Sequence, residues 1–117
     1  MWYLPETLQG IDDGGADSIV FELIECFQID TAGRFVSLHD AVGRLDAATV
    51  RSEAHSVRGS ARQMGAEPLA ALCQALETGA PRMNWPELEC QLSQAEARFG
   101  EVCCAMSEYV KSRQSAV

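Results

Sequence analysis

The chain has 117 residues, of which 47% are hydrophobic and 22% charged, and this suits one soluble globular domain around a single core. Its formal net charge of −8 argues against nucleic acid and anionic membranes as partners, because both attract Lys and Arg. No apolar run is long enough to cross a bilayer, and the N-terminus lacks the pattern of a secretory signal. We therefore predict one domain over residues 1–117, located in the cytoplasm.

The first predicted helix starts near Asp17, a candidate N-cap, and ends at Gly43, where glycine suits a helix C-terminus. Its apolar stripe, spaced by three and four residues, is Val20, Ile24, Phe27, Thr31, Phe35, Leu38 and Val42. The second predicted helix begins after Asp46, another candidate N-cap, and ends at Gly65. Its stripe is Ala47, Val50, Ala54, Val57, Ala61 and Met64.

The third predicted helix starts at about Pro68, a residue tolerated in a first turn, and ends before Gly79. Its apolar residues are Leu69, Leu72, Cys73 and Leu76. The fourth opens at NWPEL, where Asn84 can cap the helix and Pro86 lies in its first turn. Its stripe is Leu88, Leu92, Ala95, Phe99, Val102, Met106 and either Tyr109 or Val110.

Four amphipathic helices with short connections favour antiparallel neighbours. No segment alternates with period two, so we predict an all-α fold, an up-down-up-down antiparallel four-helix bundle. The N-terminal segment WYLPETLQGI can add a short helix that covers one end of the bundle. Trp2 and Trp85 are expected to pack at the bundle ends rather than to stack on a ligand.

The cysteines are odd in number, lie on helical patterns and include no CxxC pair, so we interpret them as reduced thiols of a cytosolic protein. Their spacing does not fit the usual zinc sites. They are Cys26, Cys73, Cys90, Cys103 and Cys104.

His55 lies in the middle of the second predicted helix, beside its apolar stripe rather than on it. A residue next to a stripe position is turned by about 100°, so His55 is expected to face solvent. Its helical neighbours are Arg51, Arg58, Gly59 and Arg62, which make this face basic.

The chemistry of this face suits a phosphoryl group. Gly59 leaves space beside the imidazole, and neighbouring cations favour a phosphate. An imidazole side chain titrates near neutral pH and can therefore act as a neutral nucleophile. The alternative interpretation is a solvated helix face that happens to include a histidine.

The stretch AHSVRGSARQMGAEPLAALCQALE, residues 54–77, resembles the signature of histidine-containing phosphotransfer (HPt) domains. The matching residues are Ala54, His55, Gly59, Ser60, Ala61, Met64, Gly65, Ala66, Leu69, Leu72, Cys73, Leu76 and Glu77. The stretch departs at Val57 and at Arg58, where the family usually has lysine. Arginine keeps the charge but not the compact ammonium geometry.

The resemblance implies a small four-helix bundle that relays a phosphoryl group between receiver domains of response regulators. His55 would accept and donate the group through Nε2, while Arg58 would steady the phosphoryl charge and Gly59 would leave room for the receiver. Glu77 would hydrogen-bond the other ring nitrogen, which fixes the tautomer and raises the basicity of Nε2.

Three further residues are predicted near the site. Ser60 is a small neighbour of His55, and Arg51 and Arg62 either belong to the docking surface or are simply solvated. His39 also has a glycine four residues later, but Val42 replaces the cation, so we do not expect His39 to carry phosphate.

The sequence has no nucleotide-binding loop and no carboxylate cluster of the kind that holds Mg²⁺ beside a phosphate. We therefore predict a phosphocarrier without a cofactor of its own, whose partners are receiver domains and a hybrid histidine kinase. The receiver would supply Mg²⁺ and an acidic pocket. Two alternatives stay open: a non-relaying module that sequesters a receiver or kinase, and the phosphoacceptor domain of a larger histidine kinase.

Overall fold

The computed structural model describes residues 2–9, 17–82 and 84–115, and within them it contains helices and no strand. The helices are α1 (Glu6–Gln9), α2 (Asp17–Gly43), α3 (Ala47–Gln63), α4 (Glu67–Gly79) and α5 (Trp85–Ser115). The predicted all-α class is confirmed, and so is the short helix before the bundle.

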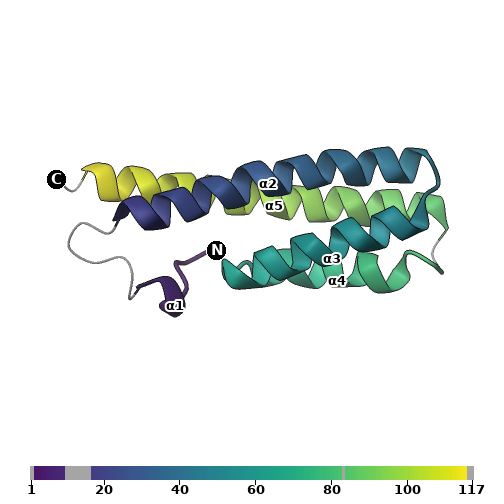
Figure 1. Ribbon diagram of the computed structural model, residues 1–117, viewed down its shortest axis with the longest axis horizontal. Coiled ribbons are helices and arrows are strands. Elements are labelled where there is room, and N and C mark those ends of the chain that lie inside the picture. The colour runs from purple at the N-terminus through teal and green to yellow at the C-terminus, as the bar shows by residue number, and fades with distance from the viewer. Residues whose placement is uncertain (1, 10–16, 83, 116–117) are drawn as a thin grey trace.

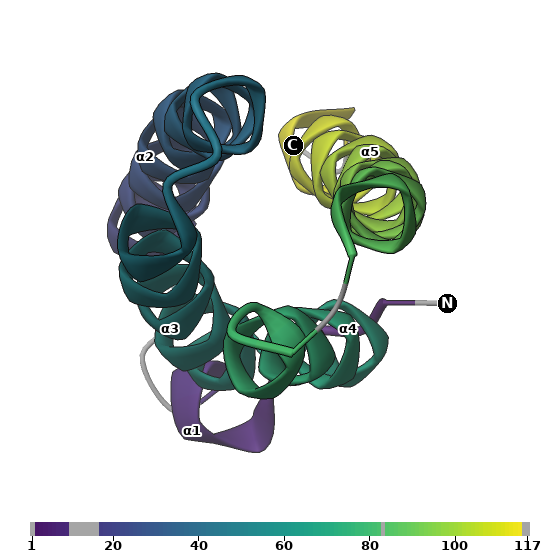
Figure 2. The same cartoon turned by 90° about the vertical axis from the view of Figure 1, so that its right-hand side faces the viewer.

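The four long helices alternate in direction and form a closed ring in the order α2, α3, α4, α5 when viewed along the bundle (Figure 2). Helices α2 and α5 are the long pair, and they extend beyond the shorter hairpin of α3 and α4 (Figure 1). The molecule is therefore a rod of 50 × 21 × 20 Å. This is the up-down-up-down arrangement that the short connections predict.

The bundle core contains nearly all of the predicted apolar stripes. Every stripe residue of α2 is buried. The exceptions in the other helices are only half-buried: Ala47 of α3, Leu72 of α4, and both Tyr109 and Val110 of α5. Ala47 is the first residue of its helix. The ring of Phe99 on α5 stacks on Phe35 at 5.3 Å and meets the edge of Phe27 at 6.0 Å, so aromatic contacts join α2 to α5.

Two of the predicted N-caps are confirmed. Asp46 accepts a hydrogen bond from the backbone N–H of Thr49 at 3.1 Å, and Asn84 accepts one from the N–H of Glu87 at 2.9 Å. Asp17 was also predicted as an N-cap, but its side chain lies outside the described part of the structure.

One predicted helix end is confirmed and another was wrong by one residue. Helix α3 ends at Gln63 with Met64 as its C-cap, and Gly65 follows in a left-handed conformation with φ 73°, so Gly65 ends this helix as predicted. Helix α4 begins at Glu67 and includes Gly79, and the backbone N–H of Ala80 still bonds to the carbonyl of Leu76 at 2.9 Å. A glycine stops a helix only where the turn that follows needs its conformational freedom.

The N-terminal segment covers the turn between α3 and α4. The indole N–H of Trp2 donates to the carbonyl of Met64 at 2.6 Å, and the Trp2 ring packs edge-on against Tyr109. Trp85 is half-buried at the start of α5 and packs against the core. Both tryptophans therefore pack at bundle ends, as predicted.

All five cysteines carry free thiols, and burial raises the pKa of Cys73 to about 12. None of the described helices has the length and apolar character needed to cross a membrane.

Candidate functional site

His55 lies on the outer face of α3, between two residues of the buried stripe. Ala54 and Val57 are fully buried, while the His55 side chain is 61% exposed. The helical period therefore turns the imidazole to solvent, as the spacing predicts.

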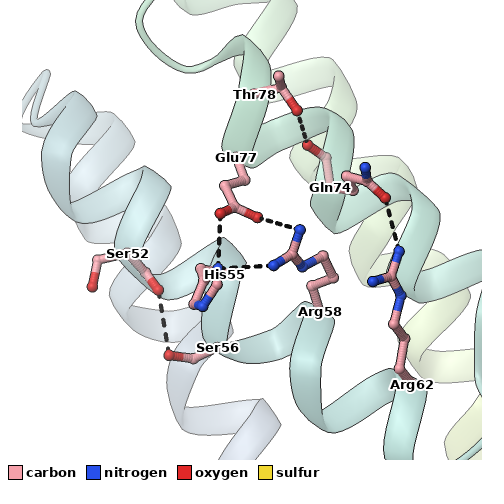
Figure 3. A network of polar contacts seen from close by, with 8 residues as sticks. All are labelled: Ser52, His55, Ser56, Arg58, Arg62, Gln74, Glu77 and Thr78. Atoms are coloured by element: carbon pink, nitrogen blue, oxygen red, sulfur yellow. Dashed lines mark hydrogen bonds and ion pairs between the residues drawn. The ribbon is translucent and has the colours of Figure 1, made fainter.

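Glu77 reaches His55 from the neighbouring helix α4. Its Oε1 lies 2.8 Å from Nδ1 of the imidazole, although the two residues are 22 positions apart in the chain (Figure 3). The α3–α4 hairpin places them side by side. The contact that the resemblance implies is thus present in the structure, while its role in phosphotransfer stays a prediction.

The contact with Glu77 assigns the ring protons. An ionised carboxylate only accepts hydrogen bonds, so Nδ1 of His55 must carry the proton and donate it to Oε1. In the neutral ring, Nε2 then keeps a free lone pair. No side chain in the described ranges hydrogen-bonds to Nε2, which leaves this nitrogen available to a reacting group from outside.

Arg58 lies one turn after His55 and contacts both members of this pair. Its Nη1 is 3.2 Å from Oε2 of Glu77, and its Nη2 is 3.1 Å from Nδ1 of His55 (Figure 3). The second contact is not a hydrogen bond, because Nδ1 already uses its hydrogen toward Glu77 and has no lone pair to accept another. The guanidinium is therefore bound to the carboxylate.

Gly59 leaves an open surface on the next turn of α3. A β-carbon added there would meet no described heavy atom within 4 Å, so the fold itself does not require glycine at this position. Ser60 beside it is half-buried. The structure therefore places a bare stretch of helix next to His55.

Arg62 and Arg51 lie on the same helix on either side of the central group. Arg62 is exposed and donates a hydrogen bond to the side chain of Gln74 on α4 at 2.9 Å. Arg51 is exposed one turn before His55 and lines an open depression of about 470 Å³ between α3 and the end of α4. The depression is also lined by Arg58, Gln74, Glu77, Thr78, Pro81 and Arg82.

Arg82 was missed by the sequence reasoning. It lies in the turn after α4, where helical periodicity no longer says which face a side chain joins. The hairpin brings this turn toward the start of α3, so that Arg82 and Arg51 line the same depression.

His39 differs from His55 in the nitrogen that is engaged. Its Nε2 lies 3.1 Å from Oε1 of Glu96, so His39 links α2 to α5 at the surface. Within the described ranges, no group of three His, Cys, Asp or Glu residues is placed to hold a metal ion.

The chain is similar to known proteins in its sequence pattern and in its fold. The family model described as "Hpt domain" matches residues 22–107. Among solved structures, the chain is similar to histidine-containing phosphotransfer protein B (HptB) from Pseudomonas aeruginosa PAO1, with 28% sequence identity and a TM-score of 0.82. The match covers 93% of this chain and 95% of that chain. No curated protein sequence matches this chain.

Proposed function

Because the chain belongs to the Hpt domain family, whose members are phosphocarriers of two-component signalling, we propose that it relays a phosphoryl group between receiver-domain aspartates through His55. One observation carries this proposal. The imidazole is exposed, its Nδ1 donates to Glu77 at 2.8 Å, and its Nε2 is left as the nucleophile.

The transfer step uses this arrangement directly. The lone pair of Nε2 attacks the phosphorus of the receiver's aspartyl phosphate, so a P–N bond forms while the P–O bond to the aspartate breaks. The receiver's carboxylate leaves as an anion, and the imidazole ring becomes positively charged. Glu77 beside Nδ1–H stabilises that charge as it develops. Transfer to the next receiver reverses the step.

The surroundings of His55 suit a docked receiver. The bare helix at Gly59 admits close approach, and Arg51 and Arg62 offer cations on either side. We propose that a hybrid histidine kinase and further response regulators provide the receivers, and that the receiver brings the Mg²⁺ and the acidic pocket. Phosphoryl transfer depends mainly on positioning and charge stabilisation, so this chain need supply little beyond the imidazole and its docking face.

The test is incubation with a receiver that carries labelled phosphate. The wild type should gain an acid-labile, alkali-stable label, and His55→Gln should lose it. His39→Gln is the matched control and should label normally, because His39 is the other histidine of the chain. A label that persists in His55→Gln would contradict the assignment.

A second arm of the same test separates a phosphocarrier from a kinase and from a non-relaying module. Labelled ATP with Mg²⁺ should leave the chain unlabelled, since we propose a carrier and not a kinase. Binding of receivers without any label on His55 would favour the non-relaying module instead.

A further inference from the structure

We infer that Arg58 is a positioning residue, which acts on His55 by holding the carboxylate of Glu77. This inference rests on the proposed function, since it concerns the same histidine. It differs from the role that the family resemblance implies, in which the cation at this position steadies the phosphoryl group itself.

The carboxylate of Glu77 is shared between two groups, one for each oxygen. Oε1 accepts the proton of Nδ1 at 2.8 Å, and Oε2 pairs with Nη1 of Arg58 at 3.2 Å. Oε2 is buried and has no hydrogen-bond partner within the described residues, so the guanidinium is its counter-charge. A buried carboxylate oxygen without a partner lowers stability, because it has lost its contacts with water. We therefore expect that, without Arg58, the Glu77 side chain would turn toward water and leave Nδ1 of His55.

Arg58 is placed on the Nδ1 side of the ring. Its Nη1 lies 3.2 Å from Oε2 of Glu77, and its Nη2 lies 3.1 Å from Nδ1 of His55. The Arg58 side chain is only 24% exposed, whereas that of His55 is 61% exposed. The cation is therefore held in the seam between α3 and α4. In this arrangement it fixes the orientation and tautomer of the imidazole before any phosphoryl group arrives.

A double-mutant cycle tests this inference through the rate of phosphotransfer from a phosphorylated receiver. Arg58→Met and Glu77→Ala should each slow transfer, by about tenfold if they resemble other supporting residues around a reactive histidine. If Arg58 acts through Glu77, the double variant should be no slower than Glu77→Ala alone. Losses that multiply in the double variant would show that Arg58 acts independently of Glu77, and would overturn the inference.

Nitrogen NMR of the unphosphorylated protein provides a second readout, which does not depend on whether His55 accepts phosphate. In the wild type, the ring proton should reside on Nδ1, and Arg58→Met should give a mixture of the two tautomers. Arg62→Met is the matched control, because Arg62 lies on the same face but bonds to Gln74, and it should leave the tautomer unchanged.

An unchanged tautomer in a folded Arg58→Met protein would overturn the inference even if phosphotransfer proceeds. Arg58→Gln, which keeps part of the side-chain stem, replaces Arg58→Met if the latter loses helical content. A wild type that shows the Nδ1 proton but never gains phosphate would count against the proposed function and leave the positioning role supported.

Discussion

Gly59 occupies an interior turn of α3, where glycine costs about 0.5–1 kcal/mol relative to alanine. The surrounding fold does not demand it, because a β-carbon would meet nothing within 4 Å in the described structure and the residue is exposed. The cost is therefore best explained by the approach of another molecule to the helix beside His55.

Gly59→Gln should keep the helical content and raise the melting temperature, because glutamine is the better helix residue. Receiver binding and phosphotransfer should nevertheless be lost. Gly100→Gln is the matched control, since Gly100 is likewise exposed and open but lies on α5, diagonally across the bundle from α3 (Figure 2). Calorimetry and a transfer assay on both variants check this, and normal transfer by Gly59→Gln would contradict the access argument.

At the scale of the elements, the α2–α3 and α3–α4 connections each contain the same type of backbone hydrogen bond, from an N–H to the carbonyl five residues earlier. The N–H of Asp46 donates to the carbonyl of Ala41 at 2.9 Å, and the N–H of Ala66 donates to Ala61 at 2.8 Å. Each turn has one residue in the left-handed region, Leu45 with φ 58° in the first and Gly65 with φ 73° in the second. Only glycine adopts this region without a steric cost.

Leu45→Gly should therefore stabilise the fold, by up to about 1 kcal/mol after allowance for the flexibility that glycine adds to the unfolded chain. Little burial is lost, because Leu45 is 63% exposed. Gly65→Ala should destabilise the fold for two reasons. Alanine is strained at this positive φ, and its β-carbon would lie 2.8 Å from Cγ of Pro5. Urea unfolding of both variants measures this, and two changes of the same sign would refute the explanation.

The cap of α3 should make stability depend on pH. The side-chain hydroxyl and backbone N–H of Thr49 donate to Asp46 and hold the pKa of its carboxyl below its usual range. A lowered pKa contributes stability that is present above the unfolded-state value of about 3.9 and is lost as the pH falls through the folded value. Helix α3, which carries His55, is thus held at its start by an ionised side chain.

Asp46→Ala should lower the melting temperature at pH 7, and its difference from the wild type should shrink as the pH falls below about 4. Asp46→Asn keeps a capping acceptor without the charge, so its difference at pH 7 should be smaller. Thermal unfolding across this pH range provides the measurement. An Asp46→Ala difference that stays constant down to pH 3 would show that the charge contributes nothing.

At the scale of the whole molecule, the positive charges are unevenly distributed. The chain has nine Lys and Arg residues against seventeen Asp and Glu, yet four of the nine are Arg51, Arg58, Arg62 and Arg82 on the α3–α4 face beside His55. Arg58 and Arg62 bond to neighbouring side chains, and Arg51 and Arg82 line the open depression together with Arg58. A local basic face on an acidic protein steers an acidic partner toward one orientation.

The double variant Arg51→Gln, Arg82→Gln should associate more slowly with a receiver, and added salt should slow it less than it slows the wild type. Dissociation should change little. Arg98→Gln is the control, because Arg98 is paired with Glu101 on α5 and should leave the salt dependence intact. Stopped-flow association at several ionic strengths checks this, and an identical salt dependence in all three proteins would exclude steering by this pair.

The positions of the helices could be read from the sequence because their causes are local. Burial of every third or fourth residue and the caps at Asp46 and Asn84 depend on neighbours within a few positions. The same periodicity predicted that His55 faces solvent. The resemblance of residues 54–77 to HPt domains added the pairing of His55 with Glu77, which periodicity alone does not contain.

The contacts between helices were decided only by the tertiary structure. The register of the α3–α4 hairpin places one oxygen of Glu77 on Nδ1 of His55 and the other oxygen on Arg58. The same register brings Arg82 to the depression beside them. The end of α4 likewise depended on the turn that follows it and not on Gly79 alone. Helical period depends on residues a few positions apart, whereas register depends on how two whole helix surfaces pack together.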